Sequence, residues 1–99
     1  MAGSKADQSL LDALHHPLRR RLLRRYLESR VMLSPKELAD LEGESLSLVS
    51  YHVRKLAEFK AVRIAGHRQV RGSLQHFYLP TRHVKDSQLV RMALGIREG

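Results

Sequence analysis

Cysteine is absent from this chain of 99 residues. Disulfide bonds, thiolate metal sites and cysteine nucleophiles are therefore excluded. No apolar run approaches the ~18 residues that a bilayer-spanning helix needs, and the N-terminus has no hydrophobic signal segment. We therefore expect no membrane association and a cytoplasmic location. The length also leaves room for only one hydrophobic core.

Acidic side chains are scarce relative to basic ones. Ten Asp and Glu stand against eighteen Lys and Arg, which gives a formal net charge of +8. This imbalance indicates a polyanionic partner, with nucleic acid ahead of an anionic membrane surface. A domain of this size buries only roughly 60–65% of its unfolded surface. Dimerisation is a natural way to bury more of it.

The first third of the chain predicts two helices that meet at a proline. Residues 1–8 are expected to form a flexible N-terminus, and leucines at helical spacing begin near Ser9. Pro17 cannot continue that helix because it lacks an amide hydrogen, but it fits the first position of a second helix ending near Ser29. We expect the arginines of this second helix to form a solvated face, with contact to flanking phosphates as the alternative. These arginines are Arg19, Arg20, Arg21, Arg24 and Arg25.

A short helix is predicted over residues 35–41. Ser34 and Glu37 stand at the two ends of a capping box, and Pro35 occupies the first helical position. Gly43 ends the helix, because glycine adopts a positive φ at low cost. The side chains expected to be buried are Leu38, Ala39 and Leu41.

A longer helix follows, from about residue 46 to residue 59. Its N-cap is expected to be Ser45 or Ser47. Its buried face is expected to contain Val49, Val53 and Leu56. A helix-turn-helix needs a small residue where the helices cross, glycine four residues later and a β-branched residue six after that. Ala39, Gly43 and Val49 meet this spacing.

The periodicity after residue 59 changes to that of strands. Val62 and Phe77 lie in two alternating segments separated by the glycine-bounded segment 66–73, which predicts a hairpin with a long basic tip. The fold class is therefore mainly α, a winged helix-turn-helix with about five helices and a two-stranded wing. We assign residues 9–81 to this domain and residues 82–99 to a C-terminal helix that serves dimerisation.

The sequence also resembles a known family. SPKELADLEGESLSLVSYHVRKLAEFKAVRI resembles the helix-turn-helix of ArsR-like winged-helix transcriptional regulators, particularly over residues 49–56. ALHHPLRRRLL is similar to the opening segment of these proteins, and VRGSLQHFYLP to the return strand of their wing. The resemblance implies a dimeric, sequence-specific bacterial regulator, often a repressor released by a small ligand or a metal. It also implies that the fourth helix enters the major groove.

The metal-sensing features of that family have no counterpart in this sequence. The thiolate signature is missing, and the carboxylate–histidine set of the terminal helix is incomplete, since only His83 and Asp86 stand at a suitable spacing. We therefore predict no metal site and no cofactor, and any small-molecule effector remains unknown.

The predicted partner is double-stranded DNA, bound by a homodimer. Arg54 is the candidate base reader, because a guanidinium can chelate O6 and N7 of guanine. Tyr51 can meet a phosphate or a thymine methyl, and Leu48 either touches thymine methyls or packs inside. Basic residues of the wing are expected to reach phosphates or the minor groove. The predicted DNA-binding residues are Lys36, Ser45, Ser47, Leu48, Ser50, Tyr51, Arg54, Lys55, His67, Arg68 and Arg71.

Other interpretations remain open at this stage. Arg54 and Lys55 can instead form a solvated helix face, and the wing can be a merely soluble loop. A winged helix that binds protein rather than DNA is the second hypothesis. An enzyme is the third, but the sequence has no nucleophile–base spacing, phosphate-binding loop or dinucleotide fingerprint. His52 is expected to be a packed, hydrogen-bonded structural histidine.

Overall fold

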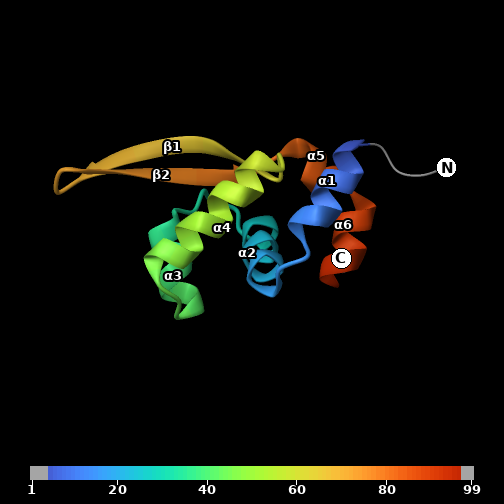
Figure 1. Ribbon diagram of the computed structural model, residues 1–99. Helices are drawn as coiled ribbons and strands as arrows, with labels where there is room; N and C mark the ends of the chain where they lie inside the picture. Colours follow the sequence, from blue (N-terminus) through green and yellow to red (C-terminus); the bar gives the residue numbers. More distant parts are fainter. Residues whose placement is uncertain (1–4, 97–99) are drawn as a thin grey trace.

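The computed structural model describes residues 5–96, which form six helices and one β-hairpin (Figure 1). This confirms the predicted winged helix-turn-helix class, with one helix more than the sequence indicated. The elements are α1 (Lys5–Ala13), α2 (Pro17–Glu28), α3 (Pro35–Glu42), α4 (Leu46–Glu58), β1 (Val62–Val70), β2 (Ser73–Pro80), α5 (Arg82–Asp86) and α6 (Gln88–Leu94).

The hairpin and the terminal helices extend the molecule in opposite directions. Helices α2, α3 and α4 form the central body, the hairpin projects from one side, and α1, α5 and α6 gather on the other (Figure 1). The resulting shape measures 50 × 24 × 22 Å. A single core joins these parts, with leucines of α1 and α2, valines of α4 and residues of the last two helices packed together. Among the described helices, none combines the length and the apolar character needed to cross a membrane.

The predicted junction between the first two helices is confirmed at Pro17. Pro17 is the first residue of α2, and the Nδ1 atom of His16 accepts a hydrogen bond from the Leu18 amide at 3.1 Å. Helix α1 begins at Lys5, earlier than the expected start near Ser9. Part of the segment expected to be flexible is therefore helical, and residues 1–4 lie outside the described part of the chain.

The helix-turn-helix is formed as its spacing predicted. The Ser34 hydroxyl accepts a hydrogen bond from the Glu37 amide, and the Glu37 carboxylate accepts one from the Ser34 amide, which completes the capping box. Gly43 has a φ of 66°. Of the two candidate caps for α4, Ser45 is the one used, since its hydroxyl accepts from the Leu48 amide at 3.2 Å. The three side chains expected on the buried face of α4 are fully buried, namely Val49, Val53 and Leu56.

The predicted burial of Leu41 is wrong. Its side chain is 56% exposed, whereas the side chain of Glu42 is only 7% exposed. Helical residues are about 100° apart, so Glu42 lies about 40° from the buried Leu38, while Leu41 is turned about 160° away from Ala39. The inward position at the end of α3 therefore belongs to a carboxylate, and arginines of α2 neutralise it.

Helix α4 ends in a left-handed turn at Lys60 rather than at a glycine. Lys60 has a φ of 65°. The Lys60 amide donates a hydrogen bond to the Ala57 carbonyl at 3.0 Å, and the Ala61 amide donates one to the Leu56 carbonyl at 2.8 Å. This pair of bonds is a Schellman motif, which satisfies carbonyls at the helix end. The chain then enters β1 directly.

The prediction of a long basic tip over residues 66–73 is wrong, because the two strands stay paired through most of this segment. The antiparallel register runs from Val62↔Pro80 to Val70↔Ser73, which leaves only Arg71 and Gly72 in the turn. Both residues have positive φ, 48° and 80°, as a type I′ turn requires, and this turn matches the twist of paired strands. A bulge between Ile64 and Gly66 leaves Ala65 unpaired.

The predicted single C-terminal helix is divided into two. Thr81 caps α5 and Ser87 caps α6, with hydroxyl-to-amide distances of 3.3 and 3.2 Å. Val90 and Leu94 of α6 are buried in the core, whereas Met92 is 77% exposed. Residues 97–99 of the predicted helix lie outside the described part.

Candidate nucleic-acid interface

Helix α4 carries six of the eleven residues predicted to bind DNA. Val49 and Val53 fix one face of this helix in the core. With about 100° between successive residues, Ser47, Tyr51 and Arg54 point away from that core. All three are exposed, and Tyr51 is 48% exposed. This face contributes nothing to the hydrophobic core and is free to meet a partner.

The start of α4 is open to solvent. Ser45 and Leu48 are exposed, so the inward-packing alternative for Leu48 is excluded in this structure. The Ser45 hydroxyl satisfies one amide of the first turn, while the remaining amides and the positive end of the helix dipole suit an anion. Ser50, one turn further on, is half-buried at the side of the helix.

Lys55 is held close to Tyr51. Its Nζ atom lies 5.6 Å from the centre of the Tyr51 ring and 3.5 Å from the Glu58 carboxylate. The Tyr51 ring in turn meets the ring of His52 edge-on at 5.1 Å. These contacts limit the rotamers of both side chains on the exposed flank of the helix.

A groove of about 420 Å³ separates α4 from the wing. Arg54, Ser50 and Leu46 form the α4 side, and the N-terminus of α3 forms one end, with Lys36 among its residues. Strand β2 forms the other wall, which contains Ser73, Leu74, Gln75, His76 and Tyr78. None of these β2 residues was among those predicted to bind DNA. The register of a hairpin closed by a two-residue turn was the signal that would have found them.

The three predicted wing residues do not share one face. His67 pairs with His76, and Arg68 pairs with Gln75. Because successive strand residues alternate in direction, Arg68 lies on the other face from His67, where its guanidinium stands 5.6 Å over the Phe77 ring. Arg71 occupies the turn at the end of the wing. All three side chains are exposed.

Lys36 lies at the groove but already has an ionic partner. Its Nζ atom is 2.8 Å from the Asp40 carboxylate, one turn along α3, and both side chains are more than half exposed. An exposed pair of this kind contributes little to stability, so a phosphate can replace Asp40 at small cost.

His52, on the buried side of α4, packs against His16, the N-cap residue of α2. The ring centres of His52 and His16 are 4.2 Å apart, and His52 is only 4% exposed. Burial first, and then the nearby His16 ring and the Arg19 guanidinium, lower the pKa of His52. The expected packing of His52 is therefore confirmed, but its Nδ1 atom has no hydrogen-bond partner among the described residues.

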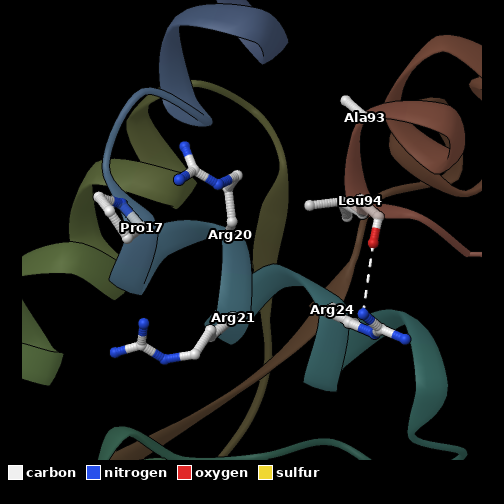
Figure 2. Close-up of a pocket in the computed structure, with 6 residues that line it drawn as sticks. All are labelled: Pro17, Arg20, Arg21, Arg24, Ala93 and Leu94. Carbon is white, nitrogen blue, oxygen red and sulfur yellow. Dashed lines mark hydrogen bonds between the residues drawn. The ribbon is translucent and has the colours of Figure 1, made fainter.

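The arginines of α2 stay partly solvated, as the sequence favoured, with Arg21 and Arg24 about half exposed, but they also make contacts within the molecule. Arg20 donates to the Leu14 carbonyl beyond the end of α1, at 2.6 Å. Arg24 donates to the Leu94 carbonyl at the end of α6, at 3.4 Å (Figure 2). Arg25 donates to the Leu41 carbonyl near the end of α3, at 3.5 Å. Cations favour the carbonyl ends of helices, so this run connects α2 to three of its neighbours.

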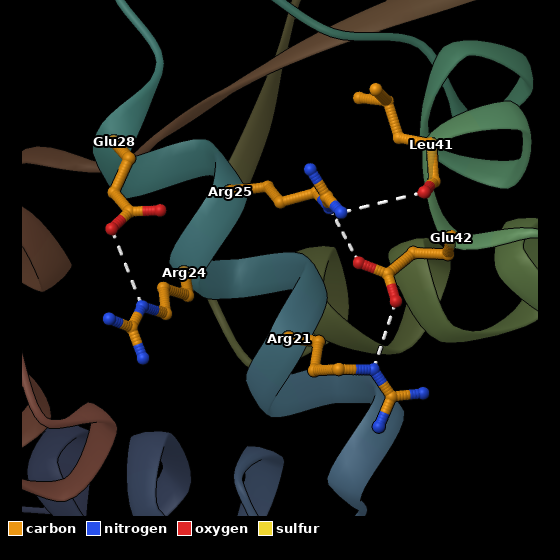
Figure 3. Close-up of polar contacts among 6 residues, drawn as sticks. All are labelled: Arg21, Arg24, Arg25, Glu28, Leu41 and Glu42. Carbon is orange, nitrogen blue, oxygen red and sulfur yellow. Dashed lines mark hydrogen bonds and ion pairs between the residues drawn. The ribbon is translucent and has the colours of Figure 1, made fainter.

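Glu42 is the centre of the tightest part of this network. Its two carboxylate oxygens accept from Arg21 at 2.9 Å and from Arg25 at 2.5 Å (Figure 3). Burial alone would raise the pKa of Glu42, but the hydrogen bonds and charges of Arg25 and Arg21 outweigh it and lower the pKa. The carboxylate is therefore held ionised between α2 and α3.

The chain is similar in structure to known winged helix-turn-helix regulators. HlyU from Vibrio cholerae aligns with a TM-score of 0.65 and 25% identity, over 89% of this chain and 87% of HlyU. An ArsR family transcriptional regulator aligns with a TM-score of 0.63 and 20% identity, over 94% of this chain and 87% of that protein. NolR from Sinorhizobium fredii aligns with a TM-score of 0.54 and 24% identity, over 96% of this chain and 90% of NolR. No protein-family model matches the chain, and no curated protein matches it by sequence.

These similarities define the fold class of the protein as a winged helix-turn-helix. Within that class, its fold is that of the ArsR-like transcriptional regulators, as the sequence resemblance implied. Among residues 5–96, no three side chains of the metal-ligating types gather into a site.

Proposed function

We propose that this protein is a sequence-specific, double-stranded DNA-binding transcriptional regulator. The observation that carries the proposal is the exposed outer face of α4, with Ser47, Tyr51 and Arg54 projecting beside a groove whose far wall is the wing. The major groove of B-DNA is about 12 Å wide and admits one α-helix. In this arrangement α4 lies in the major groove.

Arg54 is the base-reading residue of the proposal. It is exposed, it lies on the outermost line of α4, and no ion pair engages its guanidinium among the described residues. A bidentate contact to guanine contributes about 1–3 kcal/mol of discrimination. The small Ser47 allows the helix to approach, while Tyr51 and Leu48 offer apolar surface to thymine methyls.

Phosphate contacts complete the proposed interface. The N-terminus of α4 at Ser45, the amine of Lys36, and Ser50 and Lys55 along the flanks suit the DNA backbone. In the wing, Arg71 extends furthest from the body, and His67 and Arg68 point to opposite faces of the hairpin. The wing thus contacts backbone or minor groove beside the site that α4 reads.

The proposed active form is a homodimer that acts as a repressor in the bacterial cytoplasm. Helix α6 lies at the end of the molecule opposite the wing (Figure 1), and its apolar side chains Leu89 and Met92 are exposed. Their burial between two copies would give two-fold symmetry and two α4 helices. A palindromic operator with half-sites about one helical turn apart follows from that symmetry. Any effector would be a small molecule of unknown identity.

The test is duplex selection followed by salt titration of the selected sequence. If a dimer neutralises about eight phosphates, affinity falls about 10⁴-fold between 50 and 200 mM salt. Arg54→Ala should relax the selected consensus, whereas the matched loss of charge in Arg30→Ala should leave it intact. Binding that is absent or independent of salt would favour the alternative of a protein-binding winged helix.

A further inference from the structure

A second hollow lies between α2 and α6, apart from the groove beside the wing. Its volume is about 280 Å³, and it is lined by Pro17, Arg20, Arg21, Arg24, Ala93 and Leu94. The α2 residues follow the spacing i, i+3, i+4, i+7, so they form one stripe of the helix surface. Figure 2 shows Ala93 and Leu94 of α6 across the hollow from this stripe.

The guanidinium groups of Arg20 and Arg24 are fixed at the two sides of the hollow. Arg20 is anchored on the Leu14 carbonyl, and Arg24 on the Leu94 carbonyl and the Glu28 carboxylate. A guanidinium has five N–H donors. These bonds engage one donor of Arg20 and two of Arg24, so further donors remain for a ligand that enters between α2 and α6.

No carboxylate is among the residues that line the hollow, so the charged side chains of its lining are all arginines. Glu42 pairs with Arg21 from the α3 side. The pair between Arg24 and Glu28 spans 3.4 Å, with both side chains about half exposed, so it is weak and replaceable. Three cations therefore surround a space whose remaining walls are the apolar side chains of Pro17, Ala93 and Leu94.

We propose that this hollow binds a small oxyanion, a carboxylate or phosphate group on a compact ligand. Arg20 and Arg24 donate to its oxygens from one face of α2, and Arg21 adds positive charge at the rim. Arginine suits this role because its planar fork binds two oxygens of a carboxylate or phosphate at once. The volume fits a compact ligand, since it lies near the lower limit of pockets that hold small molecules.

The experiment uses the full chain without DNA, so its outcome is independent of the proposed function. Inorganic phosphate and citrate are titrated at constant ionic strength, with binding followed by calorimetry and by backbone amide NMR shifts. We expect saturable shifts confined to residues 18–24 and 93–94. Arg20→Gln and Arg24→Gln should each weaken binding about tenfold, as loss of a charged hydrogen bond implies. Arg30→Gln, which removes the same charge outside the hollow, should bind as the parent does.

Two measurements keep the result decisive. The unfolding temperature of each variant shows whether it is folded, and Arg24→Lys keeps the charge while removing the fork. Weaker binding by folded Arg24→Lys supports the proposed geometry. The proposal is overturned by unsaturable shifts, by shifts at α4 or the wing instead of the hollow, or by equal weakening in Arg30→Gln.

Discussion

Two basic surfaces of this small domain differ in what their charges do. On α2 the arginines are engaged within the molecule, with Arg21 and Arg25 on Glu42 and Arg20 and Arg24 on helix-end carbonyls. On the outer face of α4, Arg54 has no such partner among the described residues. The dense run of arginines on α2 thus holds helices together, while Arg54 on α4 is available to a partner.

The density of charge in a sequence therefore does not identify the surface that binds a partner. Cations near helix ends and a buried carboxylate are held by geometry that exists only after folding. Arg54 is exposed and forms no ion pair among the described residues, so its guanidinium can bind a partner outside the molecule. We therefore expect substitutions on α2 to change stability and substitutions on α4 to change duplex affinity.

Removal of the Glu42 carboxylate should have the largest effect. Glu42→Ala leaves two arginines without their common partner at a side chain that is 7% exposed. Loss of one member of a buried charge network lowers the free energy of unfolding by about 3 kcal/mol or more. Because both arginines are partly exposed, we expect a loss close to about 3 kcal/mol for this variant. Urea unfolding measures it. Glu44→Ala, at an exposed position of the same turn, is the control, and equal stability of the two variants would contradict the assignment.

Arg54→Ala should lower duplex affinity by about 1–2 kcal/mol, which is roughly 5- to 30-fold, with little change in stability. Arg25→Ala should do the reverse, because its guanidinium bonds Glu42 and the Leu41 carbonyl. Fluorescence anisotropy with the selected duplex and urea unfolding of both variants test this exchange. A loss of affinity in Arg25→Ala equal to that in Arg54→Ala would remove the distinction between the two surfaces.

Local signals in the sequence predicted much of the fold. The Ser34 capping box, the αL turn at Gly43 and the buried stripe of α4 depend on neighbours within a few residues, so spacing alone revealed them. The length of the wing strands could not be predicted from local spacing in the same way. Their pairing depends on a turn at Arg71, a residue type that rarely adopts positive φ.

Contacts between distant parts of the chain were beyond the reach of sequence spacing. The neutralisation of the inward Glu42 carboxylate depends on arginines seventeen and twenty-one positions earlier. The β2 wall of the groove depends on the hairpin register. The positions on α4 could be predicted because a single buried face determines which residues point outward.

Acid should weaken the contact between α2 and α4 through His52. Its pKa is lowered in the folded protein, so the unfolded chain binds a proton more readily. The stability from neutral His52 is therefore present above the ordinary pKa of about 6.5 and is lost as the pH falls through the lower folded value. Unfolding between pH 7.5 and 5 measures this dependence. His52→Gln should flatten it, and an unchanged slope in that variant would assign the effect to other groups.

The smallest expected effect distinguishes the end of the wing from α2. Arg71→Ala removes a cation from the exposed turn, so duplex affinity should fall by a similar factor for all sequences, and the salt slope should decrease by about 1. Arg21→Ala removes the same charge from a site that faces Glu42, so the slope should stay as in the parent. Salt titrations of both variants on one duplex make the comparison. A reduced slope in Arg21→Ala would show that α2 also touches phosphate, and the two basic surfaces would then act as one.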